Sequence, residues 1–202
     1  MISVYFAPPG VGKSSLCARI AFWEHVKKKI HLSKYNRVYC NFPLKYTYLY
    51  DKEDLGIFSF GDGNNLILCD EAGIWFYARE YKRMEKRQIE FFKLARHYHC
   101  DIILFSQSFD IDKSIRDNAP ELRYLKRCTL LPYHIKALRI HKSIMVDEVQ
   151  HQLLDGYEFD PIFTRIFTTR RYYLPFYWGM FDSWDAPELE EKPEGFKYYD
   201  GK

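Results

Sequence analysis

The segment Ala7-Pro8-Pro9-Gly10-Val11-Gly12-Lys13-Ser14 is the most informative stretch of this 202-residue sequence. Its two glycines allow the backbone to wind tightly with its N–H groups turned inward. The apolar run Ile2–Phe6 before it predicts a buried strand, and residues from Ser14 to about Lys29 predict a helix. A glycine-rich loop that joins a strand to a helix and ends in Lys-Ser is typical of a site for the phosphates of a nucleoside triphosphate.

Each part of this loop has an expected role. The ammonium of Lys13 should contact the β- and γ-phosphates of ATP, and the hydroxyl of Ser14 should bind Mg²⁺. The N-terminus of the following helix adds free N–H groups and a favourable dipole. Ala7 stands where the usual pattern has its first glycine. The residues expected to bind the nucleotide are Ala7, Pro8, Pro9, Gly10, Val11, Gly12, Lys13, Ser14 and Ser15.

An acidic pair follows the apolar run Leu66–Cys69, which predicts a strand buried on both faces. In a parallel sheet the carboxyl end of this strand lies beside the phosphate loop. Asp70 is then expected to hold Mg²⁺ together with Ser14, and Glu71 to orient and deprotonate the attacking water. Taken alone, an acidic pair after a strand is also compatible with a helix cap or a turn.

Gln107 ends the next predicted strand, Asp101–Phe105, where its amide can contact the γ-phosphate and the water. The strand Arg37–Phe42 lies between the loop helix and the acidic strand. This order, with Glu71 beside the metal-binding aspartate, fits the additional-strand, catalytic-glutamate P-loop ATPases and fits kinases and GTPases poorly.

ATPases of this division usually act as rings, in which an arginine of one subunit reaches the γ-phosphate bound by its neighbour. The candidates for this role are Arg79, Arg96, Arg116 and Arg123. Arg96 and Arg116 are favoured because they bracket the Gln107 strand. A homo-oligomer, with a hexameric ring as the active form, is the expected assembly.

The alternation of strands and helices predicts an α/β fold with a mainly parallel central sheet flanked by helices. We expect one P-loop domain over residues 1–184, with a core of about 1–120 and a strand-rich extension of about 121–184, and an exposed tail at 185–202. A helix is expected over Arg79–Tyr98 and irregular structure over Lys45–Asn64. In the extension we expect strands at Arg123–Leu131, Ile135–His141 and Phe163–Tyr173, and a helix or loop at Met145–Leu154.

Composition limits the partners and the cellular compartment that the protein is expected to have. A net charge of +3 permits a nucleic-acid partner without arguing for one. The five cysteines lack metal-binding spacing, which favours buried, reduced thiols. No apolar run approaches the roughly 18 residues of a membrane-spanning helix, and the loop follows the N-terminus too closely to leave room for a signal peptide. These features predict a cytoplasmic protein.

The sequence resembles a known family over residues 3–184. Besides the loop, the resemblance is carried by the segments RVYCNFPL (37–44), LILCDEAG (66–73), ARHYHCDIILFSQSFDIDKSIR (95–116) and a late aromatic segment, expected to be a strand, ending in GMFDSW (179–184). Together these are similar to the N-terminal domain of the zonular occludens toxin (Zot) family. That family includes the assembly ATPase of filamentous phages and belongs to the FtsK–HerA-like ATPases.

The resemblance implies a RecA-like core and ATP hydrolysis coupled to export of single-stranded phage DNA during virion assembly. It places nucleotide roles on Gly10, Gly12, Lys13, Ser14, Asp70, Glu71 and Gln107. Typical members continue into a membrane-spanning segment, which this chain lacks. We therefore expect either an isolated domain in the host cytoplasm or a short member held at the inner membrane by a membrane-anchored or phage coat partner.

Two other functions share parts of this pattern. A kinase of a small molecule or nucleotide would use the same loop, but it also needs a lid with phosphate-binding arginines and an acceptor pocket, which the sequence does not reveal. A slow, nucleotide-gated scaffold in phage assembly would fit the many aromatic residues and the lack of a strong basic stripe. DNA-stimulated ATP consumption and DNA translocation distinguish a motor from both.

Overall fold

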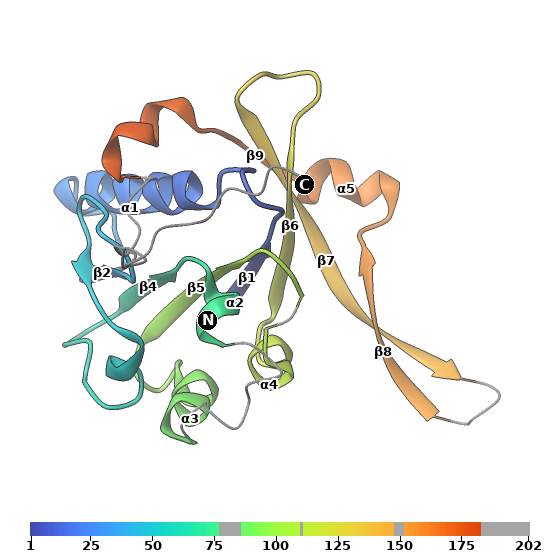
Figure 1. Ribbon diagram of the computed structural model, residues 1–202, viewed down its shortest axis with the longest axis horizontal. Helices are drawn as coiled ribbons and strands as arrows, with labels where there is room; N and C mark the ends of the chain where they lie inside the picture. Colours follow the sequence, from blue (N-terminus) through green and yellow to red (C-terminus); the bar gives the residue numbers. More distant parts are fainter. Residues whose placement is uncertain (77–85, 110, 148–151, 183–202) are drawn as a thin grey trace, which may run out of the picture.

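The computed structural model describes residues 1–76, 86–109, 111–147 and 152–182. A nine-stranded mixed sheet forms its centre, in the order β3-β2-β4-β5-β1-β6-β7-β8, with β9 paired to β7 (Figure 1). The strands are β1 (Ile2–Phe6), β2 (Arg37–Cys40), β3 (Tyr48–Leu49), β4 (Asn65–Cys69), β5 (Cys100–Ser106), β6 (Glu121–Arg127), β7 (His134–Asp147), β8 (Gln152–Phe159) and β9 (Arg170–Tyr173).

The half of the sheet from β3 to β6 is parallel. Every residue of β1 and of β4 is buried, because both faces of these central strands are covered. Parallel pairing brings the carboxyl ends of β1, β4 and β5 to one edge of the sheet. The phosphate loop, the acidic pair and Gln107 therefore emerge side by side.

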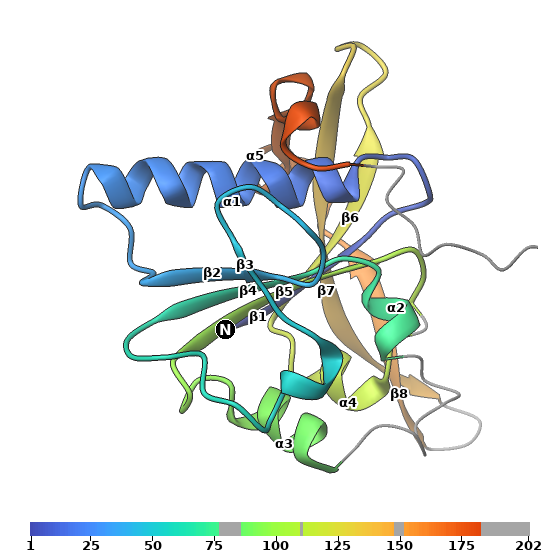
Figure 2. The same ribbon diagram turned by 60° about the vertical axis from the view of Figure 1, so that its left-hand side comes forward.

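Helices cover both faces of this parallel half, as Figure 2 shows. Helix α1 (Lys13–Lys29) lies on one face, where Leu16 and Cys17 join a core with Leu68 and Phe105. Helices α3 (Lys86–Leu94) and α4 (Lys113–Asp117) lie on the other face. The second core there contains Phe91 and Phe92 of α3, Ile115 of α4 and Phe76, which follows the short helix α2 (Ala72–Trp75). A 3₁₀ turn, η1 (Lys52–Asp54), follows β3.

The C-terminal part extends the sheet with antiparallel strands. Strand β7 pairs with β6, β8 and β9, and the long β7–β8 hairpin projects away from the parallel half (Figure 1). Helix α5 (Ile162–Thr168) connects β8 to β9. The chain then returns to α1 through the 3₁₀ helix η3 (Pro175–Met180), whose Tyr177 packs into the core beside α1.

This architecture confirms the predicted α/β fold with a mostly parallel sheet and added C-terminal strands. The predictions for the first strands and for α1 are also confirmed, with bounds that differ by two residues at most. All five cysteines are free, four of them are buried, and Cys128 is half-buried. The division at residues 120 and 184 stays a prediction, since β6 to β9 continue the same sheet.

Several local predictions were wrong. The strand predicted over Phe163–Tyr173 is helix α5 followed by the short strand β9, and GMFDSW begins within the 3₁₀ helix η3 rather than a strand. The described parts of Met145–Leu154 are strand, because β7 pairs with the whole of β8 from Ile140 to Asp147. In Lys45–Asn64 the structure contains β3 and η1. The described part of the helix predicted over Arg79–Tyr98 is α3 followed by a turn at 95–99, where His99 has a φ of 52°.

Candidate nucleotide-binding site

The loop after β1 has the conformation that its glycines permit. Gly10 and Gly12 have φ values of 71° and 109°, in the left-handed region that side chains disfavour. Gly12 is also confined by packing, since a Cβ there would lie 2.6 Å from Leu174 Cδ1. The N–H of Leu16 donates to the carbonyl of Gly12 at 3.0 Å, which starts α1 directly after the loop. The free N–H groups at the start of α1 are therefore available to a phosphate.

Lys13 and Glu71 meet at the end of this loop. The Lys13 side chain is only 5% exposed, and its Nζ lies 3.2 Å from Glu71 Oε1. Glu71 has a φ of 49°, which turns the chain sharply between β4 and α2. The turn lies close to the end of β5, because a Cβ at Gly73 would be 2.8 Å from Ser106 Oγ. The fold thus holds Lys13, which follows the loop after β1, in direct contact with Glu71, which follows β4.

Ser14 and Asp70 form the second contact between the loop and β4. The Ser14 hydroxyl donates a hydrogen bond to Asp70 Oδ2, while Asp70 Oδ1 accepts one from the N–H of Glu71 at 2.9 Å. Burial is the main cause that raises the pKa of Asp70 above its usual value. A cation beside this carboxylate would offset that cost. One hydroxyl and one carboxylate next to a phosphate site fit Mg²⁺, which keeps most of its other ligands from water and phosphate.

Asn41 positions Asp70 from the end of β2. Its Oδ1 accepts from the N–H of Asp70 and its Nδ2 donates to the carbonyl of Asp70, both at 2.8 Å. Asn41 was not among the residues predicted from the sequence. A polar side chain at the carboxyl end of the strand next to the acidic one is the signal that could have found it, as it did for Gln107.

A cavity of about 430 Å³ brings most of the predicted residues together. The exposed Gln107 faces it from the end of β5. Its lining residues are Pro9, Gly10, Gly12, Lys13, Ser14, Ser15, Glu71, Gln107, Trp178 and Phe181. Of the other predicted residues, Ala7 is fully buried and donates to the carbonyl of Ser106, Pro8 is exposed, and Val11 lines an adjacent cavity. Trp178 and Phe181 were not predicted.

The candidate arginines do not gather at this cavity. Arg96 is exposed in the turn before β5, at the opposite end of that strand from Gln107. Arg116 donates to the carbonyl of Phe109 at 2.6 Å and lies over the ring of Tyr157. Arg123 is buried, where it pairs with Glu121 at 2.6 Å. Arg79 lies outside the described residues.

A different arginine contacts the loop. Arg127, at the end of β6, donates from Nη2 to the carbonyl of Gly10 at 2.6 Å. Only the folded topology, which places β6 next to β1, reveals this contact.

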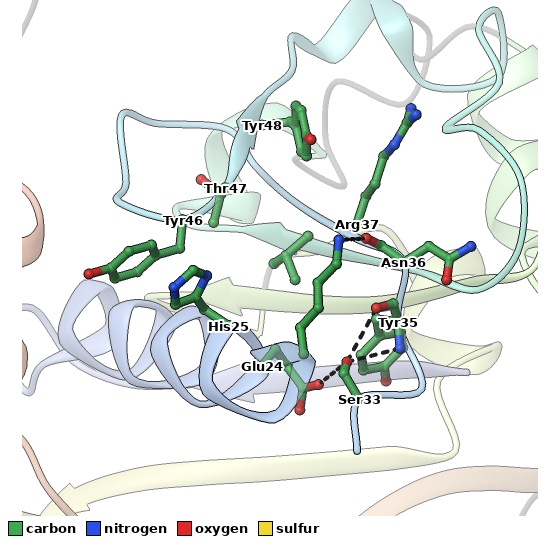
Figure 3. Close-up of a pocket in the computed structure, with 11 residues that line it drawn as sticks. Glu24, His25, Ser33, Tyr35, Asn36, Arg37, Tyr46, Thr47 and Tyr48 are labelled. Carbon is green, nitrogen blue, oxygen red and sulfur yellow. Dashed lines mark hydrogen bonds between the residues drawn. The ribbon is translucent and has the colours of Figure 1, made fainter. Parts of the chain in front are cut away.

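A further cavity, of about 300 Å³, lies between the second half of α1 and the segments around β2 and β3 (Figure 3). There His25 stacks on Tyr46, with 4.1 Å between ring centroids, and Lys28 donates to the carbonyl of Asn36. None of the predicted site residues lines it. In the described ranges we find neither a helix suited to cross a membrane nor a cluster of three or more metal-binding side chains.

Comparison with known proteins bears on the fold and the family of the chain. The structure resembles the crystal structure of the N-terminal domain of zonular occludens toxin from Neisseria meningitidis, with a TM-score of 0.58 and 14% identity, over 90% of this chain and 98% of that chain. It also resembles the genome packaging NTPase B204 of Sulfolobus turreted icosahedral virus 2 in complex with sulfate, with a TM-score of 0.50 and 16% identity, over 80% and 96% of the two chains.

The same viral NTPase in complex with ATP-γS gives a TM-score of 0.48 at 15% identity, over 80% and 97% of the two chains. Curated protein sequences give no match. The family model described as "Zonular occludens toxin (Zot)" matches residues 50–154, which is more than half of the chain and includes Asp70, Glu71 and Gln107. This chain therefore belongs to the zonular occludens toxin (Zot) family.

Proposed function

We propose that this chain is a Mg²⁺-dependent ATPase that drives the export of single-stranded DNA during assembly of a filamentous phage. The observation that carries the ATPase part is the pair of contacts at the end of the phosphate loop. Lys13 meets Glu71 and Ser14 meets Asp70, and the cavity that Lys13, Ser14 and Glu71 line also contains Gln107. A phosphate ligand, a metal ligand, a base and an orienting amide thus lie within one site.

The chemistry follows from these positions. Lys13 and the loop N–H groups would bind the β- and γ-phosphates, so that the ammonium exchanges its contact with Glu71 for a phosphate oxygen. Glu71 is then free to accept a proton from the attacking water, which Gln107 would orient. Ser14 and Asp70 would hold Mg²⁺, which supplies positive charge that neutralises the phosphate oxygens.

The motor part of the proposal rests on the family and on the positions of the two favoured arginines. B204, which resembles this chain in fold, is described as a genome packaging NTPase. Arg96 and Arg116 lie away from the loop in their own chain, so either would act only on the site of a neighbour in a ring. We propose a homo-oligomer, with the hexamer as its active form, located in the host cytoplasm or at the inner membrane through a membrane-anchored or coat partner.

ATP turnover with different second substrates tests this function. We expect hydrolysis to phosphate and ADP that single-stranded DNA stimulates, and a shift from monomer to hexamer when a non-hydrolysable ATP analogue and DNA are added together. Turnover that instead requires a small phosphoryl acceptor would establish a kinase. Binding of ATP with negligible turnover in the presence of DNA would favour the nucleotide-gated scaffold.

A further inference from the structure

We propose that Tyr133 and Trp178 hold the base of the nucleotide whose phosphates bind the Gly10–Ser14 loop. This inference rests on the proposed nucleotide binding and names the part of the site that the loop residues leave unassigned. Three features carry it: a cavity that adjoins the phosphate cavity, the two exposed rings at its wall, and the contacts that hold the segments bearing these rings.

The second cavity at the loop, of about 460 Å³, adjoins the cavity of about 430 Å³ that contains Gln107. Gly10, Gly12, Ser15 and Trp178 line both cavities. Lys13, Ser14 and Glu71 line only the first, whereas Tyr133 and Leu174 line only the second. A molecule bound by phosphates at Lys13 can therefore extend past Ser15 into the second cavity without leaving the protein surface.

The two cavities differ in chemistry in the same way as the two ends of a nucleotide. Charged side chains and the loop backbone line the phosphate end. The other end is lined mostly by apolar side chains, among them Tyr133, Leu174 and Trp178, together with Arg127 and His134. His134 Nδ1 donates to the carbonyl of Pro132 at 2.9 Å, so only its Nε2 remains for a ligand. This arrangement suits a flat, largely apolar group joined to a polyanion.

Tyr133 and Trp178 form the aromatic wall. Their ring centroids are 5.9 Å apart at an angle of 77°, an edge-to-face contact that makes a corner in the cavity. Their exposed fractions of 65% and 51% are high for aromatic residues in contact with one another. Part of the surface of each ring is therefore open to a purine, and stacking on such rings contributes substantially to nucleotide affinity.

The fold fixes the chain segments that carry the two rings before any ligand binds. The N–H of Leu174 donates to the carbonyl of Tyr133 at 3.3 Å, and Leu174 in turn packs on Gly12. Next to Trp178, the hydroxyl of Tyr177 accepts a hydrogen bond from Trp23 Nε1 of α1 at 2.9 Å. These contacts connect η3 to the turn, to α1 and to the loop itself. Because these segments are fixed, only the two side chains would have to be ordered on binding, which keeps the cost to the affinity small.

The test compares ATP with inorganic tripolyphosphate, which has the phosphates but no base. Calorimetric titration in the presence of Mg²⁺ would be carried out on the full chain and on Trp178→Ala, Trp178→Phe and Tyr133→Ala. Phe163→Ala serves as the control, because Phe163 is an exposed ring on α5 that lines neither cavity. We expect Trp178→Ala to weaken ATP binding by about 10-fold, Tyr133→Ala to weaken it less, and Trp178→Phe to retain most of it. Tripolyphosphate binding should stay unchanged in every variant.

The outcomes separate this inference from the proposed function. Equal ATP affinity for Trp178→Ala and Phe163→Ala would overturn the base site, as would an equal loss of ATP and tripolyphosphate binding, which would mean that Trp178 only supports the loop. Wild-type protein that binds tripolyphosphate as tightly as ATP would overturn the base site and leave the phosphate site standing. Wild-type protein that binds neither would overturn the proposed function as well.

Discussion

Leu174 packs directly over Gly12, and a Cβ at residue 12 would lie only 2.6 Å from Leu174 Cδ1. This contact joins the first loop of the chain to a residue far along the sequence, just before η3. The N–H of Leu174 also bonds to the β6–β7 turn through the carbonyl of Tyr133. The C-terminal segment is thus part of the candidate site and packs against the phosphate loop.

Gly12→Ala should destabilise the protein by about 2 kcal/mol, because alanine disfavours a positive φ and its Cβ meets Leu174. Thermal or urea denaturation measures the change. Gly179→Ala is the matched control, since a Cβ there would meet nothing within 4 Å. In the double variant Gly12→Ala, Leu174→Ala, the combined loss should be smaller than the sum of the single losses. Strict additivity would show that the two residues do not restrict each other.

Asn41→Ala should raise the Mg²⁺ concentration needed for half-maximal ATP turnover and lower stability by about 1–3 kcal/mol. The variant removes both hydrogen bonds to the backbone of Asp70, which is buried and loses its alignment with Ser14. Asn36→Ala is a suitable control, because Asn36 makes an exposed amide bond to the carbonyl of Asp62. The same Mg²⁺ requirement in both variants would contradict a positioning role for Asn41.

The chemistry of the phosphate end was predictable because it follows short-range rules. A strand, a glycine-rich loop and a helix are adjacent in sequence, so local pattern alone places Lys13 and Ser14 at the start of α1. The carboxyl ends of parallel strands share an edge, which places Asp70 and Gln107 beside them. Composition and spacing were sufficient for these residues.

The remainder of the site depends on long-range packing that no local pattern contains. Trp178 lies over the loop because η3 packs on α1 through Tyr177, and Arg127 reaches Gly10 because β6 pairs with β1. The aromatic, β-branched run that begins at Phe163 favours a strand by composition, yet it forms α5 after Pro161, which stands at the helix N-cap. The pairing of β7 with β8 likewise extends strand structure into a segment predicted as helix or loop.

Asp101→Asn should destabilise the protein at neutral pH. Burial alone would raise the pKa of Asp101, but hydrogen bonds from Lys34, the amino group of Met1 and Tyr35 lower it to about 2. Because the folded value lies below the unfolded value near 4, the ionised carboxylate stabilises the fold above that pH, and this contribution is lost as the pH falls toward 2. We expect a difference of about 1–2 kcal/mol at pH 7. In denaturation experiments the gap between variant and wild type should close between about pH 4 and pH 2, and a gap independent of pH would contradict the charge-based origin.

The proposed mechanism depends most on Glu71 as the base, and the ATP turnover of the Glu71→Gln variant tests this role directly. Glutamine keeps the size of the side chain and its reach toward Lys13, but it cannot accept a proton. ATP affinity, measured in parallel, should stay close to the wild-type value, while turnover in the presence of Mg²⁺ and single-stranded DNA should fall by at least about 100-fold. Near-normal turnover with intact ATP binding would contradict the role of Glu71 as the base.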